Sequence, residues 1–294
     1  MNQATSVVTR HTVFLLLCGV GAAFFFSPVV HLLRMSFHSE LYSHIPLIPL
    51  ISLFILFFRR KKILGDITWG WAGAVLLALG SIALLNANRI GGIDNNDYLS
   101  MVMSGAVLWF IGSFVLAYGG KAFKEAMFPL LFLVFVIPIP EFILQPLLDL
   151  LLIGSAYSSE LIFSLTGVPV YREGFVFALP GVTIEVAEQC SGIRSSIALI
   201  ITSVLAGYLF LKSGWSRLIL VLSFFPITVF KNGMRIVTLS LLASYVDMRF
   251  ITGSWLHKSG GIPFFAMGLA LMAPVLWVLM KTEERKGRNS EIVE

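Results

Sequence analysis

The sequence predicts an all-α polytopic membrane protein, on three observations. Hydrophobic residues make up 57% of the 294 residues and charged residues only 13%, and the mean hydropathy is +0.89, so the chain has too little polar surface for a soluble globule of this size. Eight segments are close to the length of roughly 20 apolar residues that a membrane span needs. The basic residues lie in short loops between these segments, so the net charge of +5 indicates membrane topology and not nucleic-acid binding.

The eight predicted spans alternate with short polar connections. The first could be taken for a signal peptide, but seven more spans follow it, so we expect a retained helix. Basic residues concentrate on the side of the amino terminus, in a cluster at 59–62 and a tail at 281–288, which predicts that both termini are cytoplasmic. The spans cover residues 12–33, 41–58, 66–86, 98–118, 125–144, 192–211, 216–241 and 261–280.

We interpret the chain as a single integral membrane domain of residues 1–294 with four parts. Residues 1–137 form scaffold helices, in which scattered Gly, Ala and Ser residues favour close helix packing. Residues 138–189 form an outer, interfacial part. Residues 190–280 form helices that carry the polar groups, and residues 281–294 form a cytoplasmic tail that we expect to be disordered.

The outer part contains two predicted elements. Pro138 and Pro140 break the fifth span, and the apolar but Ser- and Glu-containing residues 147–166 predict an amphipathic helix that lies in the outer interface and does not span. Short β-branched and aromatic runs with Gly and Pro between them, at 167–186, predict a β-hairpin. The hairpin leads the chain directly to Cys190.

Cys190 is the most chemically informative residue, because it follows a polar stretch and precedes an apolar span. Cys18 belongs near the inner end of the first span, too far away for a disulfide bond, so we expect a free thiol at the outer boundary. If the helix starts near Glu188 or Gln189, its free N–H groups and dipole lower the pKa of the thiol. Arg194 shares that face one turn later.

Two further polar groups are expected on the same outer side. Lys231, Asn232 and Arg235 form one stripe on an otherwise apolar span, and ionisable residues inside spans normally face a polar cavity and mark function. His257 precedes the last span, where proton transfer is feasible. A thiol, a proton carrier and a cation for the oxyanion are the parts of a thiol acyl-transfer site. Each residue taken alone also fits a structural role, since a lone Cys often fills space and an Arg can snorkel.

These residues also resemble the signature blocks of the exosortase/archaeosortase family. The matching blocks are Glu188-Gln189-Cys190-Ser191-Gly192-Ile193-Arg194-Ser195, then Asn232-Gly233-Met234-Arg235-Ile236, then His257 before a Gly-containing apolar helix.

The resemblance implies a catalytic trio of Cys190, Arg235 and His257. We take Asn232, Arg194, Ser191, Gly192, Glu188 and Lys231 as supporting residues, and expect no metal or cofactor. The implied activity is that of a plasma-membrane or inner-membrane cysteine protease and transpeptidase with an extracytoplasmic site. It cuts carboxy-terminal sorting signals of the Pro-Glu-Pro type from exported proteins and passes the new carboxyl end to a lipid- or glycan-linked acceptor at the cell surface. No nucleic acid is expected as a partner.

Two alternatives remain open from the sequence. An intramembrane protease that only hydrolyses would use the same acyl-enzyme. A non-enzymatic transporter or assembly factor for exported polysaccharide would use Lys231, Arg235 and Arg172 to bind an anionic lipid-linked sugar. A carrier would be supported by inverted repeats, and the sequence shows none.

Overall fold

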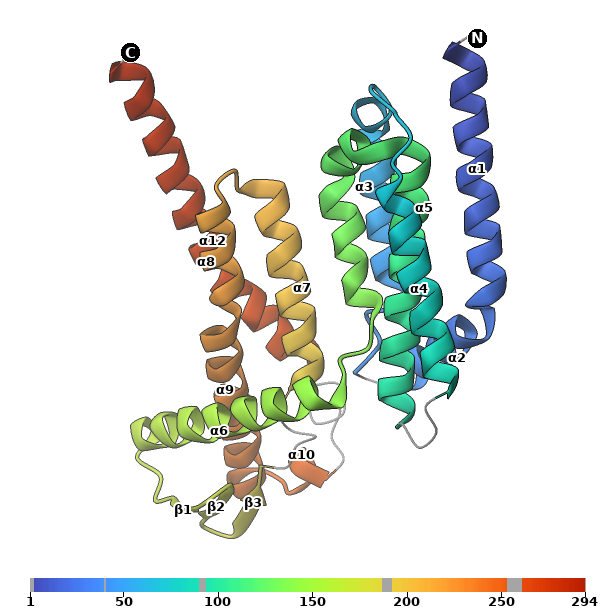
Figure 1. The fold of residues 1–294 in the computed structure, drawn as a ribbon. Coiled ribbons are helices and arrows are strands. Elements are labelled where there is room, and N and C mark those ends of the chain that lie inside the picture. Colours follow the sequence, from blue (N-terminus) through green and yellow to red (C-terminus); the bar gives the residue numbers. More distant parts are fainter. Residues whose placement is uncertain (1–2, 40, 90–93, 187–191, 253–260, 294) are drawn as a thin grey trace. The chain divides into compact units, whose positions relative to one another are not determined.

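The computed structural model describes residues 3–39, 41–89, 94–186, 192–252 and 261–293. Helices dominate, and the single sheet in these ranges has three short strands. The chain divides into two compact units, Met1–Ile143 and Leu144–Glu294. Each unit is described by itself below, with the elements labelled in Figure 1.

The first unit is a group of helices built around one long element. It contains α1 (Gln3–Phe24), α2 (Phe26–His38), α3 (Leu47–Ile63), α4 (Ala72–Arg89), α5 (Asn95–Phe132) and the 3₁₀ helix η1 (Leu133–Val136). Gly119, with φ 85° and ψ 177°, interrupts α5 and divides it into two helices. Figure 1 shows the second part of α5 returning beside the first. These two parts correspond to the predicted spans 98–118 and 125–144.

Small residues bring α4 and α5 into backbone contact, as the sequence predicts for packed membrane helices. A Cβ atom at Gly80 would lie 2.7 Å from the Gly105 carbonyl oxygen, and one at Gly105 would lie 2.8 Å from the Gly80 carbonyl oxygen. A Cβ atom at Gly73 would lie 2.8 Å from Leu116 Cα. Larger side chains at these positions would push the two helices apart.

The two ends of this unit differ in chemistry. At one end, Lys62 pairs with Glu125 at 2.9 Å and Lys121 pairs with Asp66 at 2.6 Å. At the other end, polar side chains at the start of α5 hold the chain around Pro138. Three hydrogen bonds do so: Asn96 Nδ2 to the Ile139 carbonyl at 2.8 Å, Ser100 Oγ to the Pro138 carbonyl at 2.7 Å, and the Glu141 amide to Asp97 Oδ1 at 2.7 Å. The basic cluster and the polar residues 94–97 therefore lie at opposite ends of the first part of α5, which runs from Asn95 to the break at Gly119.

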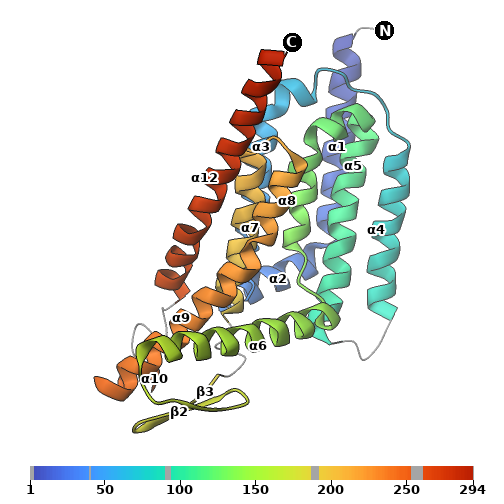
Figure 2. The same cartoon turned by 90° about the vertical axis from the view of Figure 1, so that its left-hand side faces the viewer.

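The second unit places a transverse helix and a small sheet at one end of a helical group. Its elements are α6 (Glu141–Thr166, which starts just before the unit), β1 (Tyr171–Glu173), β2 (Val176–Leu179), β3 (Val182–Glu185), α7 (Ile193–Phe210), α8 (Gly214–Leu222), α9 (Phe224–Tyr245), α10 (Arg249–Thr252) and α12 (Gly261–Val293). Figures 1 and 2 both show α6 running across the direction of α7 and α9. This is the arrangement predicted for an interfacial helix.

The predicted hairpin is a three-stranded antiparallel meander in the order β1-β2-β3. Both of its tight turns contain a glycine at positive φ, namely Gly174 at 60° and Gly181 at 81°. Pro180 precedes Gly181, which is the residue order of a type II turn. The sequence predicts a hairpin over 167–186, and the structure differs in that a turn at Gly174 divides the first predicted run into two strands, β1 and β2.

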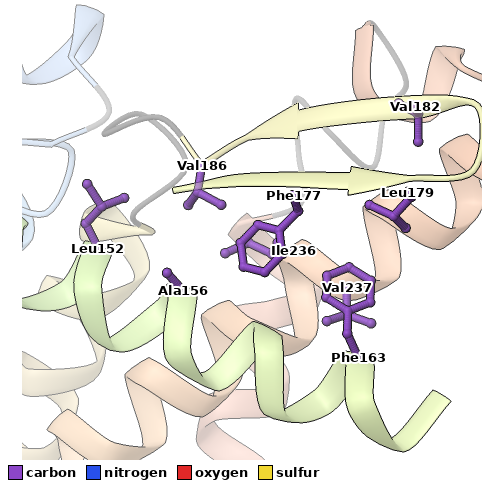
Figure 3. Close-up of a cluster of buried hydrophobic side chains, with 9 residues drawn as sticks. All are labelled: Leu152, Ala156, Phe163, Phe177, Leu179, Val182, Val186, Ile236 and Val237. Carbon is purple, nitrogen blue, oxygen red and sulfur yellow. The ribbon is translucent and has the colours of Figure 1, made fainter. Parts of the chain in front are cut away.

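The sheet, α6 and α9 share one hydrophobic cluster, shown in Figure 3. Phe163 of α6 and Phe177 of β2 are 2% and 0% exposed, with ring centroids 5.5 Å apart. The α9 side chains in the cluster are Ile236 and Val237. The sheet is therefore packed against α9 next to Arg235.

Within the described residues, six helical segments are long and apolar enough to cross a membrane, where the sequence predicts about eight spans. They are Val7–Phe24, Asn95–Val136, Glu141–Thr166, Ile193–Phe210, Gly214–Tyr245 and Ile262–Lys286. The Asn95–Val136 segment would be about 63 Å long as one straight helix, twice a hydrocarbon core, and its reversal makes it two passes. The multi-pass all-α fold is confirmed, whereas the number of spans stays a prediction.

Two predicted boundaries are wrong. The first span does not run through 12–33, because α1 ends at Phe24 and α2 begins at Phe26. Pro28 accounts for this break, since a proline ring clashes with the carbonyl four residues earlier, which is that of Phe24. The predicted tail is drawn as the continuation of α12 to Val293 and not as irregular chain. Residues 281–286 are good helix formers, and both carboxylate oxygens of Glu283 accept hydrogen bonds, from the Lys212 and Ser213 amides at 2.8 and 2.9 Å.

Candidate active site

The candidate site begins at the amino-terminal end of α7. In the described residues this helix begins at Ile193, with Gly192 in the left-handed conformation (φ 67°, ψ 22°) as its N-cap; the start near Glu188 or Gln189 considered from the sequence lies outside the described residues. Three groups converge on the Gly192 carbonyl: the Ser195 hydroxyl at 2.9 Å, the Ser196 hydroxyl at 2.8 Å and the Ser196 amide at 3.0 Å. They fix the orientation of the peptide at which the chain enters α7.

Gly192 lies directly against the side chain of Asn232 on α9. A Cβ atom at Gly192 would overlap the Asn232 amide, with 2.9 Å to Cγ and 2.9 Å to Nδ2. Side-chain carbons are not found so close, so only glycine fits here, and its left-handed φ independently favours glycine. Asn232 is itself buried, at 1% exposure. Two of the predicted supporting residues are thus in contact.

Lys231 occupies the interior between α7, α9 and α12. It is 0% exposed, and its Nζ donates a hydrogen bond to the hydroxyl of Ser195. On α12, a Cβ atom at Gly268 would lie 3.4 Å from Lys231 Cδ, which is van der Waals contact, so the aliphatic part of Lys231 lies beside α12 at Gly268. In the described part of the chain, no carboxylate forms an ion pair with this ammonium.

Arg235 lies one turn after Lys231 on α9 and is partly exposed. It is close enough to Lys231 for the two positive charges to repel. The stripe of polar residues predicted from the i, i+3 and i, i+4 spacing therefore exists, but its members differ in environment. Lys231 and Asn232 face the helical interior, and Arg235 reaches a less enclosed position.

The packing of α9 against α6 is close at the same level. A Cβ atom at Gly233 would lie 2.8 Å from Ser158 Cβ, and one at Gly154 would lie 2.9 Å from Val229 Cγ2. The two helices therefore cross where both carry small residues. This crossing sets the depth of the Asn232–Arg235 turn relative to the transverse helix.

A cavity of about 400 Å³ lies between the end of α6 and the sheet. Arg172 lines it and pairs with Glu160 at 2.5 Å, while its guanidinium stacks on the Tyr157 ring at 4.5 Å. The apolar wall includes Phe163 and Phe177. Arg172, named by the sequence as a possible anion ligand, is thus already paired with an acid.

Several predicted site residues are not described. Glu188, Cys190, Ser191 and His257 lie outside the described residues, so their placement and the predicted trio stay predictions. Arg194 is described, and it is exposed on α7, unlike the buried Ser195 that follows it. Cys18 is a free cysteine on α1. No group of three or more His, Cys, Asp or Glu residues that could hold a metal occurs within the described ranges.

Sequence reasoning missed two residues of this arrangement. Ser195 was quoted in the first signature block without a role, and Gly268 was not singled out. The signal for Ser195 was its spacing, because residues three and four positions after a helix N-cap can bond back to it. Nothing in the sequence alone indicates that Gly268 faces Lys231, because that contact joins different helices.

The comparison with known families covers the residues of this site. The family described as transmembrane exosortase matches residues 33–274, which is well over half of the chain and includes both Gly192 and the Asn232–Arg235 turn. The chain belongs to the transmembrane exosortase family. The match also extends through α3, α4 and α5, so the first unit of this exosortase is part of the family pattern and not an unrelated addition. No curated protein and no solved structure matches the chain.

Proposed function

We propose that this protein is a membrane-embedded cysteine protease and transpeptidase. It cleaves carboxy-terminal sorting signals of the Pro-Glu-Pro type from exported proteins and transfers the new carboxyl end to a lipid- or glycan-linked acceptor at the cell surface. Family membership supports the class of protein. One structural observation supports the chemistry, namely the contact between Gly192 and Asn232, which joins two of the three signature blocks.

The short stretch of chain between Cys190 and Gly192 limits how far Cys190 can lie from this contact. The thiol residue is two positions before Gly192 in the sequence, and two residues span at most about 7 Å. Gly192 touches Asn232, and Arg235 is three residues, about 4.5 Å of helical rise, further along the same helix. A cysteine tethered at this distance can share a site with the Arg235 guanidinium.

In the proposed reaction, the Cys190 thiolate attacks the scissile carbonyl and forms a tetrahedral intermediate. Arg235 donates hydrogen bonds to its oxyanion, with Asn232 positioning that arginine, and Arg194 is the reserve candidate for the oxyanion role. His257 protonates the departing amine, and the C–N bond breaks to leave a thioester. His257 then removes a proton from the incoming nucleophile, which displaces the cysteine as its thiolate and restores the starting protonation of both residues. Water as that nucleophile gives hydrolysis, and an acceptor amine or hydroxyl gives transfer.

The proposed orientation places this site outside the cytoplasm. In the second unit, Lys212 and the basic end of α12 meet at Glu283, whereas Figure 1 shows the sheet, α6 and the start of α7 at the other end. Positive residues favour the cytoplasmic side. The transverse α6 and the sheet would then receive the substrate's membrane-anchored tail at the outer surface of the plasma or inner membrane.

The proposal is tested by following cleavage of a tagged exported protein that carries a carboxy-terminal motif, helix and basic cluster. Cys190→Ala is expected to abolish cleavage, and Cys18→Ala, which removes the cysteine of α1, should retain it. Arg235→Ala should lose about 100- to 1000-fold in rate, the usual effect of removing one oxyanion donor. Full cleavage by Cys190→Ala would refute the thiol mechanism.

A further inference from the structure

The buried Lys231 has a contact for which the proposed chemistry gives no role. Its Nζ donates to Ser195 Oγ, and Ser195 in turn donates to the Gly192 carbonyl at 2.9 Å. The three residues form a chain of hydrogen bonds from the interior of the helical group to the peptide that precedes α7. A donor at one end polarises the hydroxyl and strengthens the bond at the other end.

Stability alone does not explain a lysine at this position. Lys231 is 0% exposed, has no carboxylate partner among the described residues and lies near the like-charged Arg235. Burying an amine without an opposite charge is costly, and apolar replacements of buried charges are often neutral or stabilising. Its aliphatic part already packs against Gly268 and between helices, where a methionine side chain would fit equally well.

We infer that Lys231 is a positioning residue, which acts through Ser195 to hold the Gly192 peptide and thereby the chain that carries Cys190. The inference rests on the proposed function for the identity of Cys190 as the nucleophile. Gly192 is confined on two sides, by Asn232 at its α-carbon and by three donors at its carbonyl. One of these donors is the Ser195 hydroxyl. When the Lys231–Ser195 bond is lost, Lys231 no longer holds that hydroxyl in place.

The test measures the reactivity of Cys190 directly, without substrate. Full-length protein with Cys18→Ala is reconstituted in lipid, and the rate of alkylation by iodoacetamide is followed across pH. Lys231→Met and Ser195→Ala are each expected to change this rate by about fivefold or more, which corresponds to the loss of one net hydrogen bond, and the double variant should be no worse than either single one. Ser203→Ala is the matched control, because Ser203 is also a 0% exposed serine of α7 but bonds only to Ile200 among the described residues.

Stability is measured on the same samples. Lys231→Met should unfold at the same temperature as the parent protein or higher, which separates a positioning role from a structural one. Unchanged alkylation in both variants would overturn the inference. A change in Lys231→Met with none in Ser195→Ala would also overturn it, because Lys231 would then act on the thiol without Ser195. If Lys231→Met fails to fold, Ser195→Ala alone decides.

The alkylation result does not depend on cleavage. If Cys190→Ala still cleaves precursor, the proposed function fails whatever the alkylation rates are. If Cys190→Ala is inactive and the two variants alkylate normally, only the positioning role of Lys231 fails.

Discussion

Substitution of Gly192 by alanine tests the contact on which the site depends. An alanine at φ 67° costs roughly 1–2 kcal/mol for the left-handed backbone alone. The new Cβ atom also overlaps the Asn232 amide, and such overpacking costs about 1–3 kcal/mol. We therefore expect Gly192→Ala to lower the free energy of unfolding by about 2–5 kcal/mol. If the Gly192 peptide moves to relieve the overlap with Asn232, we expect cleavage to be impaired.

A matched control separates the effect of the Gly192–Asn232 contact from the cost of the left-handed backbone. Gly174 also has a left-handed φ, 60°, but nothing lies within 4 Å of a Cβ atom built there, so Gly174→Ala should cost only the backbone share of roughly 1–2 kcal/mol. The assay is denaturant unfolding in detergent micelles, with precursor cleavage measured in parallel. Adding Asn232→Ala should relieve part of the Gly192→Ala penalty and none of the Gly174→Ala penalty. Equal stability and equal cleavage for the two glycine variants would refute the contact.

Two further predictions concern the helix boundary and the proximity of the signature blocks. Glu283→Gln should lower stability by about 0.5–1.5 kcal/mol, the net value of one hydrogen bond, because glutamine keeps one acceptor oxygen for the Lys212 and Ser213 amides where glutamate has two. Glu284→Gln, one residue further on, should have no effect on the thermal midpoint; equal effects would show that Glu283 does not hold the connection between α7 and α8. In a Cys18→Ala protein, Asn232→Cys should form a disulfide with Cys190 under mild oxidation. Phe230 is 44% exposed on another side of α9, so Phe230→Cys should not form this disulfide. Loss of thiol labelling that returns on reduction is the readout, and equal cross-linking of the two would contradict a shared site.

Much of the fold can be predicted from the hydropathy of the sequence and from the residues that break helices and strands. The spans at 192–211 and 261–280 match α7 and α12 within a few residues at their predicted outer ends, because long apolar runs without breakers give a clear signal. The transverse α6 was also predicted, from polar residues spread along an apolar segment. The failures came from single residues that hydropathy does not register: Pro28 near the start of α2 acts locally on the preceding turn, and Glu283 acts non-locally, since its carboxylate reaches Lys212 on a different segment.

The site was predictable in its residue types but not in its contacts. Spacing on one helix placed Lys231, Asn232 and Arg235 together, since the helical repeat alone determines that relation. The contact of Gly192 with Asn232 and that of Ser195 with Lys231 join α7 to α9, and helical periodicity says nothing about which faces of different helices meet.

The central claim is that Cys190 forms a covalent acyl intermediate with its substrate at this site. The most direct measurement is mass spectrometry of the protein recovered during turnover of a precursor, with and without hydroxylamine. We expect a thioester between the Cys190 sulfur and the cleaved carboxyl end, which hydroxylamine removes and which accumulates when the acceptor is withheld. Turnover of the precursor with no hydroxylamine-sensitive adduct, or an adduct that persists in Cys190→Ala, would contradict the account.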